Sequence, residues 1–223
     1  MTRKRVNQSQ SARSILGTVG HRIGWFFACF LCFVVAAPAA EPKTIVFFGD
    51  SLTAGYGVDP DEAYPALIQK KIEEAGLPWR VVNAGLSGET TSGGLRRLDW
   101  ILRQKVDIFV IELGGNDGLR GIAPAVTRAN LNRMIERIRR QSPDVRVVLT
   151  GMLLPTNMGP EHTRDFAAIF PEIARENAVV LIPFLLDGVG GNPSLNLPDG
   201  IHPTAEGHKI VAETVWHTLQ PLL

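Results

Sequence analysis

Short apolar runs rich in β-branched residues alternate along the chain with segments of helical periodicity, and this alternation constrains the fold more than any other feature. The apolar runs lie at residues 44–48, 80–83, 108–111, 145–149 and 179–182. Apolar residues recur every three to four positions over residues 65–75, 125–141, 166–177 and 205–219. Strands that are apolar on both faces and alternate with helices are typical of a parallel sheet covered by helices on both sides. We therefore predict one α/β domain, a three-layer α/β/α sandwich of about five parallel strands.

Residues 1–40 differ in composition from the rest of the chain and have the pattern of a secretory signal peptide. A basic segment without Asp or Glu precedes an apolar run at residues 25–36, and small residues at 37–40 form an A-x-A-type cleavage site. The apolar run is shorter than the roughly 17–25 residues that a transmembrane helix needs. We predict a cleaved signal peptide at 1–40, a mature domain at 41–223 and a periplasmic or secreted location. An uncleaved N-terminal anchor is the alternative.

Charge and cysteine content exclude several functions for the mature domain. Five of the 23 Lys and Arg residues lie in residues 1–40, whereas all 22 Asp and Glu residues lie in 41–223. A mildly acidic domain without a basic patch is not typical of nucleic-acid binding. Both cysteines, Cys29 and Cys32, lie inside the apolar run of the leader. The mature domain therefore has no thiol for a disulfide or for thiolate chemistry.

A serine follows the first predicted strand, at the edge of the sheet where α/β proteins bind their ligands. Ser51 lies in a Gly-Asp-Ser-Leu sequence at a strand-to-helix turn, where glycine allows a tight bend. Asp50 or Ser51 could instead simply cap the next helix, as such residues often do. Because a serine hydroxyl is a weak nucleophile without a base, the choice depends on residues elsewhere in the chain.

A candidate base lies in the loop Asp-Gly-Ile-His-Pro at residues 199–203. Asp199 can hydrogen-bond one ring nitrogen of His202, which leaves the other nitrogen free to take a proton from a serine. The loop could also be a surface turn, since Asp-Gly is a common turn dipeptide. A metal site of Asp199, His202 and His208 is a further alternative, but it lacks a recognisable ligand spacing. We assign no role to His162, His208 or His217.

Two glycine-rich loops could stabilise an oxyanion. The side-chain amide of Asn116 and the backbone N–H of Gly88 both follow predicted strands and could donate to the same point. Glycine-rich loops also bind phosphate, so a non-catalytic module for small anions or nucleotides is the alternative from another class. Neither a P-loop nor a dinucleotide fingerprint occurs, however. We expect Asp50 and Asp117 to brace their loops, and Glu112 to bond the loop backbone near Gly88.

Four sequence blocks occur together in a fixed order: G-D-S-L at 49–52, a glycine at Gly88, G-G-N-D at 114–117 and D-G-I-H at 199–202. Together they resemble the blocks of the SGNH (GDSL) hydrolases. The resemblance extends from about residue 44 to the end of the chain. It is strongest to the bacterial periplasmic group of thioesterase I, protease I or lysophospholipase, also called arylesterase.

The resemblance implies the fold and the chemistry of that family. The fold is a flavodoxin-like sandwich, with Ser51 as nucleophile, His202 as base and Asp199 as its partner. The implied oxyanion hole consists of the Ser51 N–H, the Gly88 N–H and the Asn116 side chain. The implied reaction is hydrolysis of carboxylic esters and thioesters through an acyl-enzyme, with no metal or organic cofactor.

Substrates and partners follow from the same resemblance. We expect a monomer that acts on small acyl esters, thioesters or lysophospholipids, with no nucleic acid and no stable membrane insertion of the mature form. An exported enzyme is separated from cytosolic acyl-CoA, which favours lysophospholipids or free esters. The loop at 153–159 resembles the group's substrate-side loop. A carbohydrate O-acetyl esterase on the same scaffold is the alternative enzyme.

Overall fold

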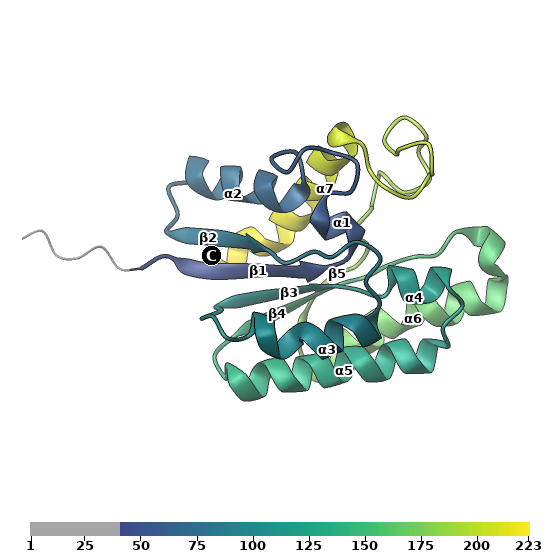
Figure 1. Cartoon of the computed structure of the whole chain (residues 1–223), viewed down its shortest axis with the longest axis horizontal. Helices are drawn as coiled ribbons and strands as arrows, with labels where there is room; N and C mark the ends of the chain where they lie inside the picture. The colour runs from purple at the N-terminus through teal and green to yellow at the C-terminus, as the bar shows by residue number, and fades with distance from the viewer. Residues whose placement is uncertain (1–40) are drawn as a thin grey trace, which may run out of the picture. The chain divides into compact units, whose positions relative to one another are not determined.

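The computed structural model describes residues 41–223, and the predicted signal peptide at 1–40 lies outside the described residues. Five parallel strands form one sheet in the order β2-β1-β3-β4-β5 (Figure 1). The strands are β1 Lys43–Gly49, β2 Trp79–Asn83, β3 Ile108–Glu112, β4 Arg146–Thr150 and β5 Val180–Ile182. Each predicted apolar run matches one of them to within one residue at either end, and the predicted α/β/α class is confirmed.

Helices cover both faces of the sheet (Figure 1). The helix pair α2 (Tyr64–Glu74) and α7 (Ala205–Leu219) packs on one face, whereas α3 (Thr91–Ile101), α5 (Pro124–Gln141) and α6 (Pro160–Asn177) form the layer on the other. The remaining elements are α1 Ser51–Ala54, α4 Gly115–Leu119 and 3-10 turns at Thr156–Met158 and Gln220–Leu222. Within residues 41–223 no helix is both long and apolar enough to span a bilayer.

The structure contains helical turns that the sequence does not predict. Helix α3 has two glycines of low helix propensity in its first turn, yet it is capped by Thr90, whose hydroxyl accepts from the backbone N–H of Gly93 at 3.2 Å. A Cβ at Gly94 would come within 2.5 Å of Leu113, so this glycine lets the helix approach the sheet closely. Helix α6 begins at Pro160, six residues before the predicted start. Proline is well suited to the first turn of a helix, and the polar residues that follow it mask the apolar periodicity.

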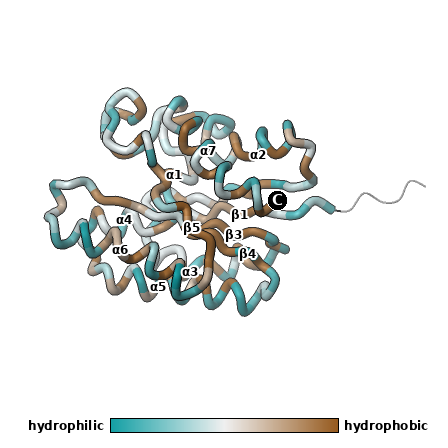
Figure 2. Tube along the Cα trace, turned by 180° about the vertical axis from the view of Figure 1, so that it is seen from behind, coloured by the Kyte–Doolittle hydropathy of each residue, from teal (hydrophilic) through white to brown (hydrophobic). Residues whose placement is uncertain are grey.

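The central strands β1 and β3 form the core of the sheet and also determine where a ligand can bind. Residues 45–48 and 108–111 are fully buried, and Figure 2 shows hydrophobic residues concentrated along these strands. The sheet extends from β1 to β2 on one side and from β1 to β3 on the other. The carboxyl ends of β1 and β3 therefore flank a topological switch point, the usual ligand position in open α/β sheets. The loops carrying Ser51 and Asn116 leave the sheet at these two ends.

Candidate active site

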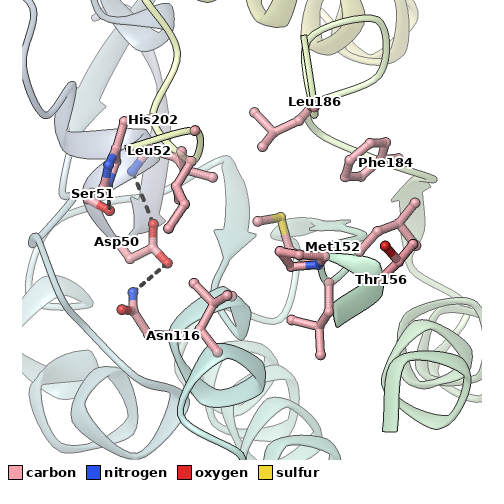
Figure 3. Close-up of a pocket in the computed structure, with 18 residues that line it drawn as sticks. Asp50, Ser51, Leu52, Asn116, Met152, Thr156, Phe184, Leu186 and His202 are labelled. Atoms are coloured by element: carbon pink, nitrogen blue, oxygen red, sulfur yellow. Dashed lines mark hydrogen bonds between the residues drawn. The ribbon is translucent and has the colours of Figure 1, made fainter. Parts of the chain in front are cut away.

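Ser51 is the first residue of helix α1, and only Asp50 separates it from the end of β1. The carboxylate of Asp50 caps this helix by accepting a hydrogen bond from the backbone N–H of Leu52 at 3.0 Å. The expected bracing role of Asp50 is therefore confirmed, and the cap leaves the Ser51 hydroxyl free for another partner. That partner is His202, whose Nε2 lies 2.8 Å from Ser51 Oγ (Figure 3).

The loop before α7 holds His202 in place through Asp199. One carboxylate oxygen of Asp199 accepts from the backbone N–H groups of Ile201 and His202, at 2.9 and 3.0 Å. The other lies 2.7 Å from His202 Nδ1. Partial burial opposes ionisation, but the backbone and imidazole hydrogen bonds outweigh it and lower the pKa of Asp199 to about 2. Asp199 is thus an ionised partner for the imidazole at all ordinary pH values, and the loop is more than a surface turn.

The two loops expected to form an oxyanion hole are linked by Arg120. Its Nη2 donates to the Gly88 carbonyl at 3.0 Å and to Asn116 Oδ1 at 3.4 Å. The Asn116 amide nitrogen donates one hydrogen to Asp50 Oδ2 at 3.0 Å (Figure 3), which leaves its second hydrogen available. Gly88 has φ +78°, a left-handed conformation that favours glycine. Asn116 and Ser51 line a cavity that opens beside the serine, whereas Gly88 does not line it.

The buried carboxyl group of Glu112 holds the turn that carries Ser51 through hydrogen bonds to residues on either side of the serine. Its Oε2 accepts from the backbone N–H of Asp50 at 3.0 Å and from the hydroxyl of Thr53 at 2.7 Å. The hydroxyl of Tyr64 lies 2.7 Å from that of Thr53 and extends this hydrogen-bond network. Burial, together with the nearby charge of Asp50, raises the pKa of Glu112 well above its ordinary value. The expected structural role holds, but the expected contact with the backbone near Gly88 is wrong. Glu112 lies beneath the turn after its neighbouring strand β1 instead.

Asp117 and His208 also have internal partners. Asp117 accepts from the backbone N–H and the hydroxyl of Thr91, at 2.8 and 2.5 Å, and so braces the start of α3 as expected. His208 is buried on α7, and its Nδ1 accepts from the backbone N–H of Tyr64 at 3.3 Å. The residues of the alternative metal site therefore do not converge, because His208 faces Tyr64 while His202 faces Ser51. Residues 41–223 contain no group of three or more His, Cys, Asp or Glu arranged to hold a metal ion.

A cavity of about 560 Å³ opens beside Ser51 and His202 (Figure 3). Its walls are mainly hydrophobic side chains from the loops after β4 and β5 and from α4. These are Leu119, Met152, Leu153, Leu154, Phe184 and Leu186. The cavity therefore suits the apolar part of a ligand whose reacting atom lies next to the serine hydroxyl.

A serine, a histidine and an aspartate hydrogen-bonded in series at the switch point of a parallel α/β sheet define a serine hydrolase. The GDSL-like lipase/acylhydrolase family matches residues 47–210, and the chain belongs to this family. The expected enzyme class, a hydrolase of ester bonds, is confirmed. The sequence blocks at 49–52, 114–117 and 199–202 all fall within the matched range.

Named relatives agree with this assignment. The chain is 41% identical over 194 residues to esterase TesA of Pseudomonas aeruginosa, covering 86% of this chain and 96% of the relative. It is 35% identical over 200 residues to thioesterase 1/protease 1/lysophospholipase L1 of Escherichia coli K12, covering 89% of this chain and 94% of the relative. A crystal structure of TesA superposes with a TM-score of 0.78 at 42% identity, covering 81% of this chain and 100% of the other.

Proposed function

We propose that the protein hydrolyses carboxylic esters and thioesters through an acyl-enzyme on Ser51. His202 takes the proton of Ser51 as its oxygen attacks the carbonyl carbon, and then gives that proton to the leaving alcohol or thiol. Water, activated by the same histidine, releases the acid and restores the serine. The observation that carries the proposal is the series of short contacts from Ser51 to His202 and Asp199, at 2.8 and 2.7 Å.

The oxyanion that forms in both steps would be held by the Ser51 and Gly88 N–H groups and the Asn116 amide. The Asn116 side chain donates to Asp50 and accepts from Arg120, so both of its polar atoms are fixed. This supports the role because a preorganised donor costs no reorientation during reaction. Each such donor is worth about 2.7–4 kcal/mol in the transition state. No step in this mechanism requires a metal or an organic cofactor.

Lysophospholipids and other esters with an apolar acyl chain are the proposed substrates. The hydrophobic walls of the cavity support an acyl chain over a sugar ring, for which a carbohydrate esterase would need polar or aromatic platforms. The signal peptide predicted at residues 1–40 supports export, and with it action on periplasmic or extracellular lipids. N-terminal sequencing of the exported protein should then begin at Ala40 or Glu41, and a start at Met1 would indicate an anchor.

A fluorophosphonate probe and a p-nitrophenyl ester series from acetate to palmitate test this function together. The probe should label Ser51, and Ser51→Ala should lose labelling and at least about 10⁴-fold in kcat while keeping its fold. Ser194→Ala, in an exposed loop, is the matched control and should retain both. A lysophospholipid and an acyl-CoA assayed in parallel distinguish the natural leaving group. Hydrolysis by a folded Ser51→Ala protein would refute the nucleophile, and an unlabelled, inactive wild type would indicate a binding module.

A further inference from the structure

Two neighbouring helices of the α3–α5–α6 layer carry rows of arginines on their outer sides. On α3 and the turn after it, Arg96, Trp100 and Arg103 follow one another at intervals of four and three residues, and all three are exposed. On α5, Arg133, Arg137 and Arg140 repeat this spacing. Residues three, four and seven apart lie on the same side of a helix. We call these six residues the arginine face.

Arg137 joins the two rows into one surface. Its Nη1 lies 3.3 Å from the carbonyl oxygen of Leu95 and 3.4 Å from Asp99 Oδ2, both on α3. Helices α3 and α5 pack side by side along this contact (Figure 1). The rows on either side of the contact therefore belong to a single continuous surface.

The charge of the arginine face is opposite to that of the rest of the domain. It contains five arginines, and the carboxylates interspersed with them are Asp99 and Glu136. Within the described part of the chain, the only one of these arginines in an ion pair is Arg137, which pairs with Asp99. Residues 41–223 as a whole contain 18 basic and 22 acidic side chains. The expectation that the domain lacks a basic patch is therefore wrong, because folding brings together arginines spread over residues 96–140.

Trp100 lies between the arginines and is 66% exposed, the largest fraction among the large hydrophobic side chains that are exposed in residues 41–223. An indole ring in the headgroup region of a bilayer buries its apolar body while its N–H remains hydrated. Arginines beside it would pair with lipid phosphates. The arginine face does not contribute to the cavity beside Ser51 or to the smaller one at residues 191–200. Its ligand therefore needs to contact an open surface rather than enter a pocket.

We propose that the arginine face docks the protein peripherally on an anionic lipid bilayer. Trp100 lies in the headgroup layer, and Arg96, Arg103, Arg133, Arg137 and Arg140 neutralise lipid phosphates around it. The Ser51 loop leaves the sheet at the carboxyl end of β1, whereas Trp100 lies at the last turn of α3, near the start of β3. Docking through Trp100 therefore leaves uncovered the carboxyl edge of the sheet, where Ser51 lies. The enzyme would be held beside lipid substrates without using its active site as the anchor.

Sedimentation with vesicles tests the docking. The full chain is mixed with vesicles of phosphatidylcholine alone, or with one third phosphatidylglycerol, at about 0.1 M salt. Wild type is compared with Arg96→Gln/Arg103→Gln/Arg133→Gln, with Trp100→Ala, and with Arg164→Gln, an exposed arginine of α6 outside the face. All variants share residues 1–40, so any binding by that segment is common to them.

Wild type should bind the anionic vesicles, and the triple variant should bind about 100-fold more weakly, since each arginine near an anionic surface contributes about fivefold. Arg164→Gln should bind like wild type, Trp100→Ala more weakly, and 0.5 M salt should release the protein. Hydrolysis of soluble p-nitrophenyl butyrate should be unchanged in every variant, which separates this test from that of the catalytic site. Equal binding by the triple variant and wild type would overturn the proposal. Wild type is also mixed with duplex DNA at the same salt concentration. Binding to the DNA but not to the anionic vesicles would overturn the proposal as well.

Discussion

The phenol ring of Tyr56 lies against the imidazole of His202, with ring centres 4.6 Å apart and planes inclined by 44°. Tyr56 follows helix α1, and its backbone N–H donates to the carbonyl oxygen of Ser51 at 3.0 Å. The ring is thus positioned by the same turn that positions the nucleophile. Tyr56 does not line the cavity beside Ser51, so its contact is with the base and not with the acyl chain. In the proposed mechanism His202 takes the serine proton, and the aromatic face can then stabilise the imidazolium by roughly 0.5–1 kcal/mol.

Tyr56→Ala should therefore lower kcat/KM by about two- to fivefold, and Tyr56→Phe should stay close to wild type because the phenyl face is retained. Both variants are assayed on a soluble ester, and circular dichroism checks that they are folded. A loss in Tyr56→Phe as large as that in Tyr56→Ala would mean that the hydroxyl group and not the aromatic ring matters.

Asp199 should matter strongly for rate and little for folding. Asp199→Asn retains an oxygen that can accept the backbone hydrogen bonds of the loop, but it no longer stabilises the imidazolium and favours the wrong tautomer. We expect a loss of about 10³–10⁴-fold in kcat with an unchanged circular dichroism spectrum. Because the pKa of Asp199 is about 2, the wild-type carboxylate stays ionised down to about pH 3. Any loss of activity between pH 7 and 5 must therefore come from another group. Nearly full activity in Asp199→Asn would remove Asp199 from the site.

Glu112 should behave as a buried neutral acid. Glu112→Gln keeps an oxygen acceptor for the Asp50 N–H and the Thr53 hydroxyl, whereas Glu112→Leu leaves both donors unsatisfied and should cost about 2–4 kcal/mol. A carboxyl group whose pKa is raised on folding loses its stabilising effect as pH rises above its ordinary value. Urea unfolding should therefore show the Gln variant gaining stability relative to wild type between pH 5 and 8. If the Gln variant were as unstable as the Leu variant at pH 5 and at pH 8, Glu112 would have to be charged.

The sequence predicts the sheet well, and it also singles out the residues proposed for catalysis, because both depend on short-range patterns. Fully buried parallel strands appear as continuous apolar runs, and residues directly after such strands necessarily meet at one edge of the sheet. Ser51 and Asn116 are therefore identifiable from the order of residues alone, whereas Asp199 and His202, in the loop before α7, are identifiable from their spacing of three residues. Helix α3 is not, because its first turn contains Gly93 and Gly94, and tertiary packing rather than propensity stabilises it.

Contacts between distant residues are what the sequence does not specify. Arg120 links the Gly88 and Asn116 loops across 32 positions, and Glu112 bonds the turn after β1 across 62 positions because β1 and β3 are neighbours in the sheet. Neither partner can be chosen from local pattern alone. For Tyr56 the only sequence signal is an aromatic residue close to Ser51, and this alone does not predict its contact with His202.

His208 provides the clearest pH dependence of stability in the domain. It is 1% exposed, its ring stacks on Tyr64 with centres 6.3 Å apart, and its Nδ1 accepts a backbone hydrogen bond. Burial, and then the charge of His202, lowers its pKa from 6.5 to about 4. The folded protein therefore holds a neutral imidazole where the unfolded chain would bind a proton.

The contribution of His208 to the free energy of unfolding should accordingly be fully present above about pH 6.5 and be lost as the pH drops towards 4, which amounts to roughly 3 kcal/mol. His208→Asn keeps an acceptor for the Tyr64 N–H and removes the titrating group. Urea denaturation of the variant should therefore show a shallower decline between pH 6.5 and 4 than wild type, even if its stability at pH 7 is lower. His217→Asn, on the exposed side of the same helix, controls for the loss of a histidine from α7. Parallel pH curves for His208→Asn and wild type would contradict the prediction, because they would mean that His208 binds its proton equally well in the folded and unfolded chain.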